Sequence, residues 1–261
     1  MLSTNLIIYK QLEAQASNRM QKSISSQLIS LNSLTALAFA ANFLITQIHF
    51  QLSPQILALS CLTICVIPAY QFIKTQKVNV LIAAVSGMAI CLFLCTAANA
   101  SSTSALFMAI VFSVTYNRNP NFGWRNNPFS KVAIVALVWT LTTVLIPLLL
   151  ANTTVDLPYL ILRFGLFCLQ ILLFEIADLP TDIRNTRSIP QLFAARFLKL
   201  ILAVCAPILA YLLEDGVFAI LLTAYLLFVI IRTKPGNRCF ADVFVEAVPL
   251  FYLILKWIAL F

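Results

Sequence analysis

The sequence predicts an all-α, polytopic membrane bundle of about nine transmembrane helices, with the amino terminus inside and the carboxyl terminus outside. Three observations support this class. Apolar residues make up 61% of the chain, and the mean hydropathy is +0.95, beyond what a soluble domain can hide from water. The apolar residues gather in runs, and basic residues occupy alternate connections between the runs. We therefore expect a multi-pass integral protein of a bacterial cytoplasmic membrane.

The apolar runs are the predicted helices. Several span 14–17 residues rather than about 20, as in tilted or interrupted membrane helices. Residues 1–29 are polar and form a predicted cytoplasmic tail, whereas residues 30–261 form one transmembrane domain. In chain order the runs are 30–50, 55–73, 79–98, 104–117, 131–150, 157–177, 195–213, 216–231 and 242–261.

The basic residues fix the predicted orientation of the bundle. Fifteen of the 17 Lys and Arg residues lie in the tail, in the loops after the second, fourth, sixth and eighth runs, or in the first residues of the run that follows such a loop. The other loops contain no basic residue, which matches the positive-inside rule. The exceptions are Lys256, which we expect to snorkel to the outer interface, and Arg163. Arg163 lies within the sixth run, where it either snorkels or faces a cavity.

Three of the nine acidic residues lie within eight positions at the end of the sixth run: Glu175, Asp178 and Asp182. At 100° per residue, they share an arc of about 60° on one helix face. Carboxylates in this position predict a Mg²⁺ site, with Asp178 and Asp182 as ligands, Glu175 beside them, and phosphate oxygens completing the coordination. In the structural alternative the carboxylates cap a helix or pair with Arg184 and Arg187.

Two cytoplasmic loops supply predicted anion-binding residues. The loop after the fourth run, TYNRNPNFGWRNNPFSK, is either an ordinary basic loop with aromatic anchors or one wall of an anion pocket. The loop after the sixth run places two arginines beside the carboxylates. The predicted diphosphate-binding residues of the two loops are Tyr116, Arg118, Arg125, Lys131, Arg184 and Arg187.

These motifs resemble the UbiA superfamily of intramembrane prenyltransferases. The stretch DLPTDIRNTRSIP is similar to that family's second aspartate-rich motif, with Asp178 and Asp182 at the aspartate positions. The loop after the fourth run is similar to the family's loop between its fourth and fifth helices. The family's first motif, however, has no counterpart after the second run, where the chain reads PAYQFIKTQKVN. Gln71, Lys74 and Lys77 are the candidates to replace it.

The resemblance implies a UbiA-like membrane prenyltransferase that moves a polyprenyl group from a prenyl diphosphate to an unknown acceptor, with Asp178 and Asp182 as catalytic residues. Its expected partners are these substrates and membrane lipid. An alternative is a non-catalytic relative that binds isoprenoid lipid or has a structural role, and a further alternative is a small transporter. Nucleic acid is excluded as a partner, because the basic residues follow topology and form no basic domain with stacking aromatics.

Overall fold

The computed structural model describes residues 33–75, 80–117, 124, 127–185 and 188–259, without the side chains of 72–75, 82, 117 and 181–185. Every regular element within these ranges is helical, which confirms the predicted all-α class. Three helical segments are long and apolar enough to cross a membrane, and they indicate a multi-pass integral membrane protein. They are Pro128–Leu150, Leu157–Pro180 and Ala195–Leu213.

The predicted apolar runs coincide with helices wherever the structure describes them. The run expected at 104–117 starts earlier, at Ala100, and the run expected to end at 177 continues to Asn185. The helices are Ser33–His49, α2 (Ile56–Thr75), α3 (Val80–Thr96), α4 (Ala100–Asn117), α5 (Pro128–Thr140) with η2 (Leu141–Leu145) and α6 (Ile146–Leu150), α7 (Leu157–Asn185), α8 (Ile189–Leu192), α9 (Ala195–Leu213), α10 (Gly216–Arg232), α11 (Arg238–Phe240) with η3 (Ala241–Val245), and α12 (Val248–Ile258).

The π-helical segments η2 and η3 each come just before a proline, Pro147 and Pro249. Proline has no N–H to donate to the carbonyl four residues earlier, so an α-helix cannot continue regularly across it. At η2 the hydroxyl of Thr46 donates to the carbonyl of Thr143, at 2.9 Å. A side chain of the first helix thus satisfies the carbonyl that Pro147 leaves unpaired.

Helix α7 continues through Pro180, and a distant loop docks where it does so. The backbone N–H of Gly236 donates to the carbonyl of Ala177, at 2.9 Å. Gly236 has a φ of +82°, and a Cβ built there would lie 3.7 Å from the Pro180 ring. Because the left-handed region favours glycine, Gly236 suits this turn. The contact fixes the loop that leads directly into α11.

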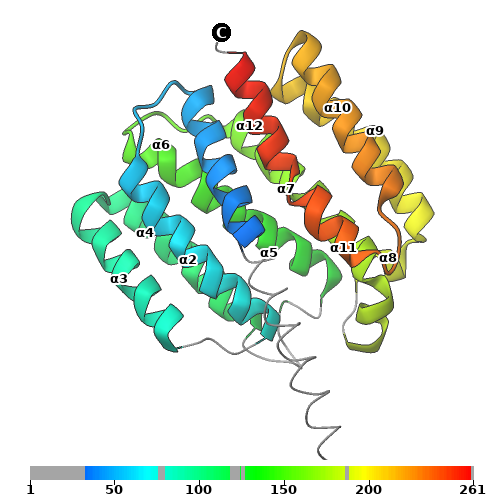
Figure 1. The fold of residues 1–261 in the computed structure, drawn as a ribbon, viewed down its shortest axis with the longest axis horizontal. Coiled ribbons are helices and arrows are strands. Elements are labelled where there is room, and N and C mark those ends of the chain that lie inside the picture. The colour runs from blue at the N-terminus through cyan, green and yellow to red at the C-terminus, as the bar shows by residue number, and fades with distance from the viewer. Residues whose placement is uncertain (1–32, 76–79, 118–123, 125–126, 186–187, 260–261) are drawn as a thin grey trace, which may run out of the picture.

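Helix α3 lies at one edge of the bundle and the α9–α10 pair at the opposite edge, with Ser33–His49 and α12 between them (Figure 1). The interior has two apolar clusters. One surrounds α7 and includes residues of α5, α9, α10 and α12, and the other joins Ser33–His49, α2, α3, α4 and α6. The side chain of Trp139 packs against both clusters. Trp139 therefore lies where the two halves of the bundle meet.

Candidate functional site

Two adjoining cavities lie inside the bundle. The polar chamber has a volume of about 460 Å³ and is lined by Ala38, Asn42, Tyr70, Tyr116, Lys131, Val135, Trp139, Phe167, Gln170, Ile171, Phe174, Asp178, Arg238, Asp242, Val245, Glu246 and Pro249. The apolar chamber has a volume of about 270 Å³ and is lined by Thr35, Phe39, Leu62, Cys65, Val66, Ala69, Tyr70, Ile90, Leu106, Ala109, Ile110, Ser113, Val114, Val138, Trp139 and Thr142.

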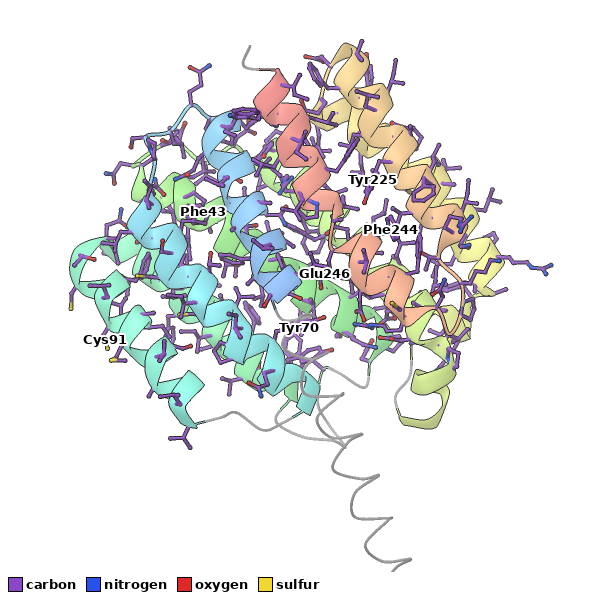
Figure 2. The ribbon with its side chains drawn as sticks, viewed as in Figure 1. Phe43, Tyr70, Cys91, Tyr225, Phe244 and Glu246 are labelled. Atoms are coloured by element: carbon purple, nitrogen blue, oxygen red, sulfur yellow. The ribbon has the colours of Figure 1, made fainter. Side chains whose placement is uncertain are left out.

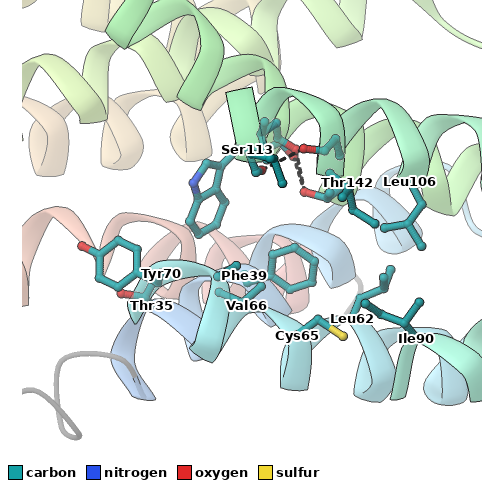
Figure 3. A pocket seen from close by; sticks show the side chains of 16 residues that line it. Thr35, Phe39, Leu62, Cys65, Val66, Tyr70, Ile90, Leu106, Ser113 and Thr142 are labelled. Atoms are coloured by element: carbon teal, nitrogen blue, oxygen red, sulfur yellow. Dashed lines mark hydrogen bonds between the residues drawn. The ribbon is translucent and has the colours of Figure 1, made fainter. Parts of the chain in front are cut away.

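The two chambers share Tyr70 and Trp139 as wall residues, so they meet at these two rings. Figure 3 shows the apolar side, where Phe39, Leu62 and Val66 surround the space together with Cys65. A charged compartment beside an apolar one suits an amphiphilic ligand, whose polar head and hydrocarbon tail need different surroundings. Ile110 and Val114 line the apolar chamber and are also exposed on the outside of the bundle, where a membrane would place lipid.

One face of α7 forms a wall of the polar chamber. Phe167, Gln170, Phe174 and Asp178 all line it, spaced three or four residues apart. This spacing places them one above another on a helix. The polar chamber therefore extends along α7 from the middle of the bundle to the end where Asp178 lies. We call this end the mouth, because α2, α4 and α7 end near it and the predicted cytoplasmic loops follow them.

Glu175 is held by partners from two other elements. Lys131 of α5 lies 2.7 Å from Glu175 Oε1, and the backbone N–H of Ile189 in α8 donates to Glu175 Oε2, at 3.2 Å. Glu175 is only 2% exposed. A carboxylate this deeply buried needs both a counter-charge and hydrogen-bond donors. The Lys131–Glu175 pair consequently joins the first turn of α5 to α7.

Arg238 connects α7 to the carboxyl-terminal helices. It donates to the carboxylate of Asp178 and lies 2.7 Å from Asp242, while its guanidinium lies over the ring of Phe174. Desolvation by burial opposes the charge on Arg238, but Asp178 and Asp242 favour it. The loop anchored at Gly236 ends at Asn237, whose side chain caps α11 immediately before Arg238.

Glu246 is the second carboxylate that the carboxyl-terminal segment contributes to this site, after Asp242. The hydroxyl of Thr35 in the first helix donates to Glu246, at 2.9 Å. Glu246 and Tyr70 both line the polar chamber, in the centre of the molecule (Figure 2). Counting Glu175 behind the wall, four described carboxylates surround two described cations, Lys131 and Arg238. The described part of the chamber is therefore net negative.

The structure brings together part of the predicted site. Tyr116 and Lys131 line the same chamber as Asp178, and Glu175 contacts Lys131. Gln71 is half-buried on α2 and is not among the residues that line the two chambers. The remaining predicted residues lie outside the described part: Lys77, Arg118, Arg125 and Arg187 entirely, and Lys74, Asp182 and Arg184 by their side chains.

The described partners of Glu175 and Asp178 are Lys131 and Arg238. The side chains of Arg184 and Arg187, which the structural alternative proposed as partners, lie outside the described residues. Sequence reasoning also missed Asp242 and Glu246. Their signal was available, since two ionisable residues four positions apart at the start of an apolar run are costly in a membrane and usually have a role.

The described residues do not by themselves fit a Mg²⁺ site. Within them, no group of three or more His, Cys, Asp or Glu side chains is placed to hold a metal ion. Arg238 contacts Asp178 Oδ2 and Lys131 contacts Glu175 Oε1, so one oxygen of each carboxylate already faces a cation of the same chain. The predicted partner Asp182 has its side chain outside the described part.

Comparison with protein-family models, with curated proteins and with solved structures finds no match to this chain. The resemblance to the UbiA superfamily remains a prediction from the motifs at Asp178–Asp182 and Tyr116–Lys131.

Proposed function

We propose that this chain is a UbiA-like membrane prenyltransferase that holds a prenyl diphosphate across the two chambers. The observation that carries the proposal is that a charged cavity and an apolar cavity meet at Tyr70 and Trp139. In the proposed complex the diphosphate lies in the polar chamber and the isoprenoid tail in the apolar one. The proposal includes nine membrane crossings, with the amino terminus and the mouth of the polar chamber in the cytoplasm.

The charges of the chamber define what the proposal requires. Lys131 and Arg238 are the described cations that face the head group, and they are outnumbered by carboxylates. A diphosphate needs more positive charge than these two supply. Six further basic residues, in or next to the predicted cytoplasmic loops, would provide it: Lys74, Lys77, Arg118, Arg125, Arg184 and Arg187.

In the proposed reaction, the allylic carbon–oxygen bond breaks and the diphosphate leaves with the bonding electrons. The acceptor forms a bond to the allylic carbon and then loses a proton. Cations at the mouth stabilise the charge that develops on the leaving group. The apolar wall around Trp139 excludes water, which would otherwise capture the allylic cation.

A second candidate function is binding of an isoprenoid lipid without transfer. The observation that favours it is the pairing of Glu175 with Lys131 and of Asp178 with Arg238. Carboxylates neutralised within the chain hold the helices together and need no metal. The two-chamber cavity suits this function as well as it suits transfer.

A transfer assay separates the two functions. The purified chain in lipid nanodiscs is given a radiolabelled prenyl diphosphate, Mg²⁺ and a panel of acceptors, and the prenylated product is measured. We expect product formation, lowered about 100-fold in Asp178→Asn and in Asp182→Ala. The matched control is Asp215→Asn, an exposed carboxylate at the start of α10 without a side-chain capping bond, which should retain full activity.

The same assay with EDTA tests the Mg²⁺ prediction, because chelation abolishes transfer if the metal is required. Lipid binding without product for any acceptor would favour the second function. If neither transfer nor binding occurs, both functions are wrong.

A further inference from the structure

Arg163 is a buried cation with no carboxylate partner among the residues that the structure describes. It lies in the apolar segment Leu157–Pro180 of α7 and is 0% exposed. Its Nη2 donates to Asn42 Oδ1, while Nε and Nη1 have no hydrogen-bond partner. Its guanidinium carbon lies 5.3 Å from the ring centre of Phe167 and 5.4 Å from that of Tyr252. The two rings stabilise the charge in part through cation–π contacts. Burying an arginine without a counter-ion nevertheless carries an unfavourable desolvation free energy.

The carboxylate that shares Tyr252 with Arg163 already has partners. Glu214 accepts from the hydroxyl of Tyr252, at 2.5 Å, and lies 2.6 Å from Lys256. Among the described residues, no carboxylate is within ion-pair distance of Arg163. Within the described part of the chain, the charge of Arg163 is therefore uncompensated, whereas Lys131, Arg238 and Lys256 are paired.

Arg163 lies directly behind the deep end of the polar chamber. Its partner Asn42 and its stacking partner Phe167 both line that chamber. Along the same face of α7, Arg163 is followed by Phe167, Gln170 and, at the mouth, Asp178. From Gln170 to Asp178 the helix rises about 12 Å. The deep end is thus well separated from the carboxylates at the mouth.

The polar groups of the deep end present hydrogen-bond donors. Gln170 is 8% exposed and its Nε2 has no partner. The oxygen of Asn42 is taken by Arg163, and its Nδ2 donates to the carbonyl of Ala38, at 2.9 Å. An amide nitrogen carries two N–H donors, so Asn42 retains one and Gln170 retains two. With the guanidinium behind them, these donors favour an anionic oxygen and disfavour a cation or a metal.

We infer that the deep end of the polar chamber, formed by Gln170 and Asn42 with Arg163 behind them, binds the carboxylate of a second ligand. A single carboxylate matches a single uncompensated cation, whereas a diphosphate carries more charge than this end can neutralise. This inference adds a second ligand to the proposed function. It rests on the proposed function in one respect, namely that the diphosphate of the prenyl substrate lies at the mouth of the polar chamber. The polar chamber would then hold two anionic groups at opposite ends of one helix face.

Trp139 provides the measurement. It lines the polar chamber, whereas Trp124 and Trp257 are exposed, so Trp124→Phe with Trp257→Phe leaves Trp139 as the single, half-buried reporter. Its fluorescence in nanodiscs is titrated with benzoate, with decanoate and with benzylamine. Benzoate represents a water-borne carboxylate, decanoate represents one supplied by the bilayer, and benzylamine reverses the charge at similar size. Empty nanodiscs correct for partitioning into lipid.

We expect saturable binding of at least one carboxylate and no saturable binding of benzylamine. Arg163→Gln should weaken binding at least tenfold, and Gln170→Leu about threefold to tenfold. Arg163→Lys should recover part of the affinity because it keeps the charge. If Arg163→Gln does not fold, as judged by circular dichroism and gel filtration, Arg163→Lys and Gln170→Leu carry the test.

The inference is wrong if neither carboxylate binds, if benzylamine binds equally well, or if the substitutions leave the affinity unchanged. The assay contains no prenyl diphosphate, so it is independent of the transfer reaction. Carboxylate binding without any prenyl transfer would overturn the proposed function and leave the deep site in place. Transfer without carboxylate binding would do the reverse.

Discussion

Lys131, which is half-buried, and Arg163, which is fully buried, are cations at opposite ends of the same chamber, and their partners differ. Lys131 lies at the mouth, 2.7 Å from Glu175. Arg163 lies behind the deep end, with an amide oxygen and two aromatic rings but no carboxylate. A paired charge is part of the scaffold, since removing its partner exposes the other charge to an apolar interior. An uncompensated charge favours a ligand that brings the counter-charge.

The largest expected effect comes from breaking the paired site. Lys131→Met removes the described counter-charge of the buried Glu175, so we expect the free energy of unfolding to fall by about 3–5 kcal/mol. Unfolding by SDS in mixed micelles measures the change. In the double variant Lys131→Met with Glu175→Met, most of the loss should be recovered. If the single and double variants are equally unstable, the pair does not carry the stability assigned to it.

A smaller loss is expected at the second paired lysine. Lys256→Met removes the cation 2.6 Å from Glu214, but the hydroxyl of Tyr252 still donates to that carboxylate. The remaining donor limits the expected loss to about 1–3 kcal/mol, measured by the same unfolding titration. A loss equal to that of Lys131→Met would show that the tyrosine hydroxyl contributes little.

Removing the charge of Arg163 should raise the free energy of unfolding, whereas removing that of Lys131 should lower it. Arg163→Met removes a buried charge without orphaning a carboxylate, so we expect the ligand-free protein to gain about 1 kcal/mol. The midpoint of unfolding should rise, and the gain should shrink when saturating carboxylate stabilises the parent protein. A loss of several kcal/mol would mean that Asn42 and the two rings compensate the charge fully, and the contrast with Lys131 would fail.

The smallest effect is expected at the exposed control. Asp215→Asn changes a charge of the same kind outside the bundle, at an exposed position. We expect less than about 0.5 kcal/mol of change in the free energy of unfolding. A larger effect would show that a change of net charge alone alters stability. The changes in unfolding free energy of the Lys131, Lys256 and Arg163 variants would then have to be corrected for that effect.

The sequence predicted the helices well because burial in a membrane and helix length are local properties of the chain. Each predicted helix was an apolar run in the sequence. The fourth run was predicted to start at 104, whereas α4 begins at Ala100, because Ser101, Ser102 and Thr103 interrupt the apolar pattern there. The π segments η2 and η3 were not predicted. Their prolines were visible, but the partner of the Thr143 carbonyl is Thr46, from another helix, and no local pattern reveals it.

The candidate site was predicted only in part. Tyr116, Lys131 and Asp178 were assigned to one cytoplasmic face and do line one chamber. Arg238, Asp242 and Glu246 were not included, although they contribute half of the described charges there. Helical periodicity shows which face of a helix carries the polar residues, but it does not show which other helices pack against that face. For Arg163, snorkelling to the interface and facing a cavity were equally consistent with the sequence. In the structure the side chain of Arg163 is fully buried against Phe167, so it lies inside the bundle, beside the polar chamber.

The contacts of the carboxyl-terminal helices have a consequence for how the protein is made. Arg238 reaches Asp178 across 60 residues of chain, and Glu246 reaches Thr35 across 211. Because a ribosome delivers the chain from its amino terminus, α7 enters the bilayer before the residues that neutralise Asp178 exist. An insertion intermediate that contains α7 but not yet α11 therefore has Asp178 without the arginine that pairs with it in the folded protein.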